Sequence, residues 1–135
     1  KEINQMTAWV VKNLGSDVPM HFSAFHPDWK MLDKPRTPKS TLVRAREIAL
    51  ANGVRYAYTG NVHNFEGHST SCHACKHLLI GRDWYELSDW NIRFDGNYVG
   101  NCANCGEPVA GVFEEVRGSW GRKRVPVKFQ RHKDG

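Results

Sequence analysis

The sequence lacks any long hydrophobic run. No stretch approaches the roughly 18 apolar residues of a membrane-spanning helix, and no charged start followed by an apolar core indicates a secretory signal. We therefore expect a cytoplasmic chain without a membrane partner. The sequence also lacks an initial Met, because Lys1 enters a helix-like pattern directly and without a capping residue. On this basis we expect the chain to be a piece of a longer protein.

Cysteine is scarce, since the 135 residues contain four, arranged as two C-x-x-C pairs. The four residues are Cys72, Cys75, Cys102 and Cys105. In a reducing compartment such pairs indicate metal ligands rather than disulfides. Two tight turns of this kind can point four thiolates at one ion and complete a tetrahedron. The flanking His73 and His77 are expected at the surface, with either able to replace an unused cysteine.

The choice of metal depends on what the site does. A four-thiolate shell can hold zinc for structure or a single iron for electron transfer. Zinc is preferred here because a small module with few strands needs an additional cross-link to be stable, and metal binding supplies folding free energy. Such a shell leaves no open position for a substrate. We therefore predict a structural zinc ion and assign no catalytic residue.

The first part of the chain begins with a helix pattern. One apolar stripe is formed by Ile3, Met6, Val10 and Leu14. Gly15 is placed to end this helix. The run VPMHFSAF, residues 18–25, then predicts a short buried strand, and a proline-rich loop follows over residues 24–37.

A second helix and strand follow. Thr37 is the expected N-cap and Pro38 the first helical residue, while Asn52 and Gly53 end the helix. Its expected buried face consists of Leu42, Ala45 and Ala49, supported by Ile48. The run VRYAYTGN, residues 54–61, predicts a second strand. Alternation of helix and strand indicates an α/β fold with a parallel sheet.

After residue 60 the pattern changes to polar loops and short strands. Residues 61–71 predict a linker loop. Short strands are predicted over 78–87, 90–100 and 108–116. Asp95–Gly96 suits a hairpin turn. We therefore predict a zinc-ribbon-like β module over residues 72–117, followed by a tail.

The tail, residues 118–135, is basic and lacks helical periodicity. Its basic residues include Arg122, Lys123, Arg124, Lys128 and Arg131. The whole chain has a formal net charge of +5 and a pI of about 9.2. This charge makes nucleic acid a candidate partner, although a modest excess is more often a solvated surface.

Several stretches together resemble one known family. They are HFSAFHP, TPKSTLVRAREIA, YTGNV and TSCHAC, all within about residues 19–84, together with the second cysteine pair. This set resembles the C-terminal part of the AmmeMemoRadiSam-system radical S-adenosylmethionine enzymes, relatives of the pyruvate formate-lyase-activating enzymes.

The resemblance implies that residues 1–60 are the last α/β units of a partial (β/α) barrel. The full-length parent would bind a [4Fe-4S] cluster and S-adenosylmethionine and generate a 5′-deoxyadenosyl radical. Its N-terminal barrel portion would be the partner of this chain, and a protein is one candidate substrate. His21 and His26 become candidate cofactor-binding residues. The aromatic Trp29, Tyr56 and Tyr58 are expected in the core.

One departure from the family concerns activity. The cluster motif C-x-x-x-C-x-x-C does not occur in this sequence. We therefore expect the chain alone to be inactive. Two other functions stay open: a stand-alone zinc-ribbon module that binds nucleic acid or protein through its tail, and a rubredoxin-like iron electron carrier.

Overall fold

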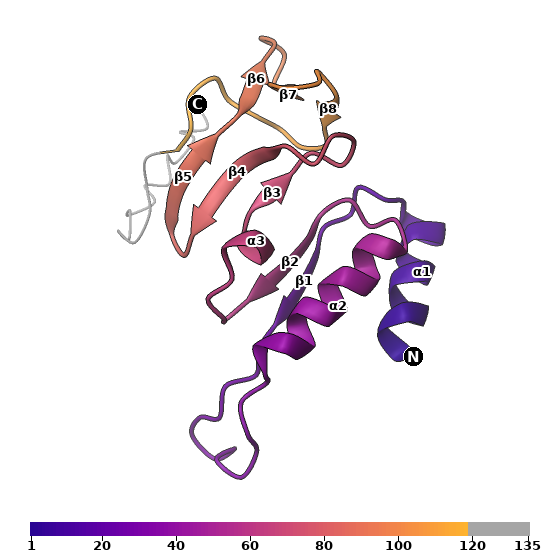
Figure 1. The fold of residues 1–135 in the computed structure, drawn as a ribbon, viewed down its shortest axis with the longest axis vertical. Helices are drawn as coiled ribbons and strands as arrows, with labels where there is room; N and C mark the ends of the chain where they lie inside the picture. Colours follow the sequence, from indigo (N-terminus) through magenta and orange to yellow (C-terminus); the bar gives the residue numbers. More distant parts are fainter. Residues whose placement is uncertain (119–135) are drawn as a thin grey trace, which may run out of the picture.

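The computed structural model describes residues 1–118, which form three helices and three short sheets (Figure 1). The basic residues of the predicted tail, from Arg122 to Arg131, lie outside the described residues. None of the helices within residues 1–118 has the length and apolar character that a bilayer crossing requires.

The N-terminal part is a two-stranded parallel sheet with helices on one face. Strands β1 (Met20–Ser23) and β2 (Ala57–Gly60) pair in parallel and are connected through α2 (Lys39–Ala51). Helix α1 (Glu2–Leu14) lies beside α2 on the same side of the sheet (Figure 1). The core between them consists of Phe22, Ala24, Leu42, Ala45, Ala49, Val54, Ala57 and Val62. The predicted α/β order and parallel pairing are confirmed.

The apolar stripe predicted for α1 is confirmed at Ile3, which packs against the core, and wrong at Met6 and Leu14. Met6 and Leu14 are 43% and 57% exposed. The side that faces the core consists of Ile3, Thr7 and Val11, at a spacing of four residues. Thr7 can be fully buried because its Oγ1 donates to the carbonyl of Ile3 at 2.9 Å and accepts from Asn52 Nδ2 at 2.7 Å. A satisfied polar side chain thus replaces the expected apolar one.

The start of α2 also differs from the prediction. Pro38 is the N-cap, and the hydroxyl of Thr37 accepts a hydrogen bond from the N–H of Phe25 at 3.0 Å. Thr37 therefore closes the loop after β1 instead of capping the helix. That loop projects away from the sheet (Figure 1), and Trp29 on it is 79% exposed rather than part of the core. The predicted helix end at Asn52 and Gly53 is confirmed.

The C-terminal part consists of two antiparallel sheets. The first contains β3 (Thr70–Ser71), β4 (Leu78–Asp83) and β5 (Glu86–Trp90), and the second contains β6 (Ile92–Phe94), β7 (Gly100–Cys102) and β8 (Pro108–Val109). The hairpin at Asp95–Gly96 is confirmed, with Gly96 at a φ of 92°. The strand predicted over 78–87 is split by a turn at Trp84 and Tyr85.

The segment predicted as a linker loop, residues 61–71, has regular structure. It contains helix α3 (Phe65–His68) and strand β3, and Gly67 is buried. A Cβ on Gly67 would overlap the hydroxyl of Thr59 and the side-chain amide of Asn64, so glycine at this position lets α3 lie close to β2. The segment packs the two parts against each other, which its polar composition did not indicate.

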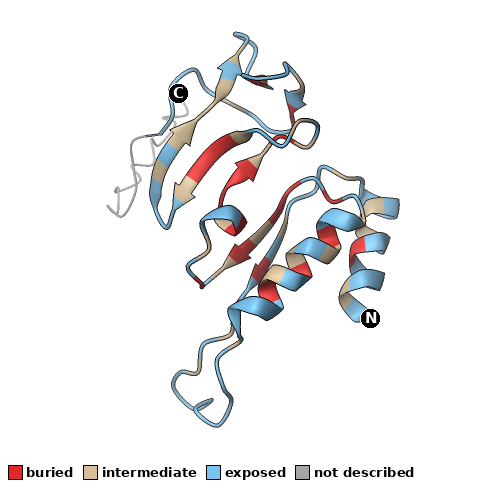
Figure 2. Ribbon diagram, in the orientation of Figure 1, coloured by how far each residue is buried: buried red, intermediate tan, exposed pale blue. Residues whose placement is uncertain are grey.

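A second core joins the two parts of the chain. Its buried residues are Tyr56, Cys72, Leu79, Ile80, Cys102 and Val109. Figure 2 shows buried stretches of β3 and β4 in red. Tyr56 comes from the segment before β2, and its hydroxyl accepts a hydrogen bond from the N–H of Ala110 at 3.1 Å. Burial raises the pKa of Tyr56, so this phenol stays neutral at physiological pH. One side chain that directly precedes the parallel sheet thus anchors the C-terminal part.

We predict that Tyr56→Phe lowers the free energy of unfolding by about 1 kcal/mol, because the N–H of Ala110 loses its acceptor. Urea denaturation measures this change. Tyr85→Phe is the matched control, since Tyr85 is 66% exposed and its hydroxyl makes no hydrogen bond with residues 1–118. Equal effects of the two substitutions would contradict the anchoring role of Tyr56.

Candidate functional site

The two C-x-x-C pairs form turns of the same geometry. In the first, the N–H of Cys72 donates to the carbonyl of His77, and the N–H of Lys76 donates to the carbonyl of Cys72. In the second turn, the N–H of Cys102 donates to the carbonyl of Glu107, and the N–H of Gly106 donates to the carbonyl of Cys102. Lys76 and Gly106 both have positive φ, at 63° and 80°. The Lys76 in the first turn therefore adopts the backbone that glycine adopts in the second.

The four sulfur atoms converge on one point. All of them lie within 4.8 Å of one another. The Sγ atoms of Cys72 and Cys105 are 3.7 Å apart, and those of Cys75 and Cys102 are also 3.7 Å apart. A tetrahedral zinc ion with Zn–S bonds of about 2.3 Å separates its sulfur ligands by about 3.8 Å. A disulfide would require about 2.05 Å. The donor set therefore fits a metal ion such as zinc.

The thiols do not ionise independently. Hydrogen bonds from the Asn104 side chain and the His77 backbone lower the pKa of Cys75 to about 6. At Cys105 the backbone hydrogen bond from Glu107 lowers the pKa, but the hydrogen bond with Cys75 outweighs it and raises the pKa to about 12. Thiolates at this spacing repel each other, so the group ionises fully only with a cation among the sulfurs.

Polar side chains outside the sulfur cluster connect the two turns. His73 Nε2 lies 3.1 Å from Glu107 Oε1, so one residue of each turn pairs with the other. Asn104 Nδ2 donates to Cys75 Sγ at 3.5 Å. Neither His73 nor His77 belongs to the group of potential ligands. Sequence reasoning considered the two histidines as substitute ligands and missed Asn104 and Glu107.

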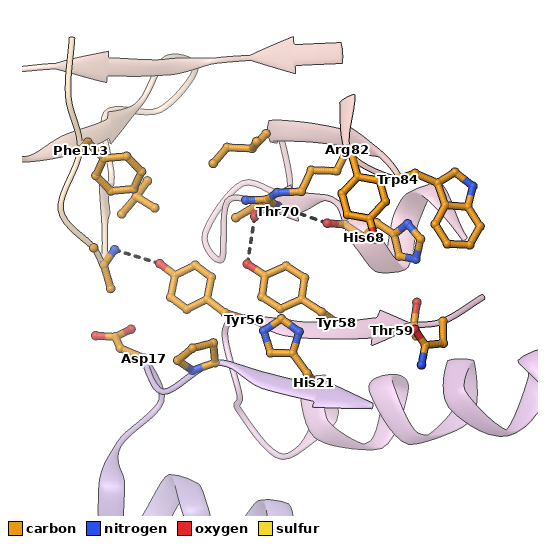
Figure 3. Close-up of a pocket in the computed structure, with 17 residues that line it drawn as sticks. Asp17, His21, Tyr56, Tyr58, Thr59, His68, Thr70, Arg82, Trp84 and Phe113 are labelled. Carbon is orange, nitrogen blue, oxygen red and sulfur yellow. Dashed lines mark hydrogen bonds between the residues drawn. The ribbon is translucent and has the colours of Figure 1, made fainter. Parts of the chain in front are cut away.

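A pocket of about 730 Å³ lies on the face of the β1–β2 sheet opposite the helices (Figure 3). One wall consists of side chains from β1 and β2, and the facing wall comes from β3, β4 and residues 109–113. Because side chains alternate along a strand, Phe22 and Ala57 point to the helices while His21 and Tyr58 point into the pocket. The His21 and Tyr58 rings lie 4.9 Å apart, centroid to centroid.

The pocket contains one of the two histidines assigned to cofactor binding. His21 lines it, whereas His26 is exposed in the loop after β1 and does not line it. Sequence reasoning missed Arg82 and Trp84, which line the pocket from β4 and its turn. For the wall formed by the parallel sheet, the sequence did contain an indication. Tyr56 and Tyr58 lie on either side of the core residue Ala57, so the alternation of side chains along a strand places both tyrosines on the sheet face opposite the helices.

Comparisons with known proteins found an archaeal protein that is similar to most of this chain. No family model matches the chain, and no solved structure matches it. Uncharacterized protein MJ0808 of Methanocaldococcus jannaschii is 41% identical to this chain over 101 residues. The match covers 75% of this chain and 29% of that protein, so the chain is similar to less than a third of its relative.

We predict that Cys72→Ser lowers zinc content well below one ion per chain, because a hydroxyl is a poor substitute for a buried thiolate ligand. Elemental analysis of the purified protein measures zinc per chain. His77→Ala, on an exposed side chain in the same turn, is the control and should keep the wild-type zinc content. Loss of zinc from the histidine variant alone would contradict the four-cysteine ligand set.

Zinc binding should weaken in acid. The pKa of Cys75 is lowered from 9.0 to about 6, so its ionised form is present above pH 6 and is lost as the pH falls. Protons then compete with the metal for the thiolates. A zinc-sensitive dye should report release as the solution is made acidic, at a pH below the metal-free pKa of Cys75, and no release as the pH rises from 7 to 9. The opposite pH dependence would contradict thiolate ligation.

Proposed function

We propose that this chain is the C-terminal segment of a radical S-adenosylmethionine enzyme and carries a zinc-ribbon-like module held by structural zinc. The ligands are Cys72, Cys75, Cys102 and Cys105. The observation that carries the metal site is the convergence of four sulfur atoms within 4.8 Å. These side chains come from two turns that are far apart in the sequence but have the same backbone geometry.

A structural role for the metal is supported by the closed donor set. Four thiolates fill a tetrahedron and leave no position for a substrate or water. The six strands around the site are two to six residues long. Sheets this small bury little apolar surface, so a metal ion that joins the turn after β3 to the turn after β7 adds stability that the core lacks.

The proposal of a partial barrel is supported by the N-terminal part. Its parallel strands β1 and β2 have helices on one face only. In a (β/α) barrel the helices lie outside and the other strand face points inward. On this proposal the pocket face would be the inner face, and His21 and His26 would be the residues that contact S-adenosylmethionine in the longer enzyme. The bound cofactor, with a [4Fe-4S] cluster, would supply the 5′-deoxyadenosyl radical.

Elemental analysis of the purified chain tests the metal assignment. We expect one zinc ion per chain and an intact four-thiolate site. One iron per chain with reversible one-electron chemistry would instead identify an electron carrier. Absence of both metals from protein purified without chelators would overturn the structural metal site.

A separate experiment tests the enzyme assignment. The proposal expects a C-x-x-x-C-x-x-C motif encoded in frame before Lys1. The longer protein, reconstituted with iron and sulfide without oxygen, should convert S-adenosylmethionine to 5′-deoxyadenosine, whereas the 135-residue chain should not. A coding sequence without that motif would overturn the radical-enzyme assignment and leave the zinc assignment standing.

A further inference from the structure

The pocket between the two parts of the chain has an aromatic lining that the metal site does not explain. Tyr58 and His21 provide two rings on its sheet wall. At the other end, Trp84 and His68 lie edge to face with 5.9 Å between centroids. Trp84 is 46% exposed, so its indole is accessible from solvent. Exposed aromatic faces at a pocket are surfaces on which planar rings stack.

Arg82 is the cationic group in this pocket that has no acidic partner. Its Nη1 donates to the hydroxyl of Thr70 at 2.7 Å and to the carbonyl of His68 at 3.2 Å. Within residues 1–118 its other guanidinium nitrogens make no hydrogen bond, and no carboxylate lies within 4.0 Å of it. By contrast Asp17, which also lines the pocket, pairs with Arg55 at 2.9 Å.

The position of Arg82 is fixed before any ligand binds. The bonds to Thr70 and His68 hold one side of the guanidinium, and Tyr58 in turn bonds to Thr70 at 2.9 Å. The Cζ of Arg82 lies 5.9 Å from the centre of the Tyr58 ring (Figure 3). A guanidinium oriented in this way offers paired N–H donors that match a carboxylate or phosphate.

We propose that this pocket binds a small planar-ring ligand that carries an oxyanion, with Arg82 as the anion-binding residue. The ring stacks on the exposed indole of Trp84, and the carboxylate or phosphate pairs with the free side of the guanidinium. A pocket of about 730 Å³ is within the size range of small-molecule sites. The pocket lies on the face that the proposed function assigns to S-adenosylmethionine, but the binding inferred here depends on residues of this chain alone and requires neither radical chemistry nor a ligand on the metal.

The test uses three probes with one ring: 1-naphthyl phosphate, 1-naphthoate and neutral 1-naphthol. Each is titrated into the zinc-loaded 135-residue chain labelled with ¹⁵N, and the indole N–H signals of the tryptophans are followed. We expect the Trp84 signal to shift, while Trp9 and Trp29, both exposed and outside the pocket, stay in place. At least one anion should bind about tenfold or more tightly than 1-naphthol, as expected for a hydrogen-bonded charge pair.

The two anionic probes distinguish which anionic group the natural ligand carries. Tighter binding of 1-naphthyl phosphate identifies a phosphorylated ligand, and tighter binding of 1-naphthoate identifies an aromatic carboxylate. Equal affinity of all three probes would overturn the role of Arg82. Shifts of Trp9 and Trp29 that match those of Trp84 would show general adsorption and overturn the pocket as a site.

Variants connect the preference to one side chain. Arg82→Gln should remove the tenfold preference for the anion, and Arg82→Lys, which keeps the charge without the paired donors, should retain part of it. Arg44→Gln is the control, because Arg44 is exposed on α2 and lies outside the pocket. Zinc content of each sample reports folding of the module. A folded, zinc-loaded Arg82→Gln protein that keeps the preference would overturn the proposal.

Discussion

The convergence of four cysteine sulfurs is the constraint on which the C-terminal part of the structure depends. The sulfurs come from turns after β3 and β7, in two separate three-stranded sheets whose strands are too short to form independent cores. Asn91, between β5 and β6, adds a second link: its N–H donates to the carbonyl of Leu79, and its carbonyl accepts from Ala103 in the second turn. Thiolates so close together repel each other, and a cation bound among them would remove this repulsion and link the two turns.

The pocket is a consequence of how this module sits on the parallel sheet. Tyr56 enters the same buried cluster as Cys72 and Cys102, which holds the module against the sheet face that the helices leave uncovered. Gly67 allows α3 to lie directly on β2 at the other end of the contact. Between these two attachments the sheets stay apart, and Tyr58, Arg82 and Trp84 line the space. Metal site and pocket are therefore distinct features that share one scaffold.

Much of the local structure could be predicted because it depends on nearest neighbours. Positive-φ turns at Gly15, Gly53 and Gly96 follow from the lack of a Cβ, and the C-x-x-C spacing by itself brings each pair of thiols together. The errors concern positions where a distant partner decides. Thr7 is buried because Asn52 satisfies its hydroxyl, and Thr37 leaves its cap position because Phe25 offers a donor. Neither partner is visible from local pattern.

The sequence by itself determined the α/β order, the parallel connection of two strands and the choice of the four cysteines as candidate metal ligands, because each depends on periodicity or on spacing along the chain. Tertiary structure alone decided that His73 and Glu107 pair across the two cysteine turns, that residues 61–71 pack as helix and strand, and that Arg82 faces Tyr58. The contacts join residues that are distant in the sequence: Cys72 and Cys105 are 33 residues apart, and Thr70 and Arg82 are 12 residues apart. Their geometry depends on burial and on hydrogen bonds between elements, which only the folded chain brings within reach.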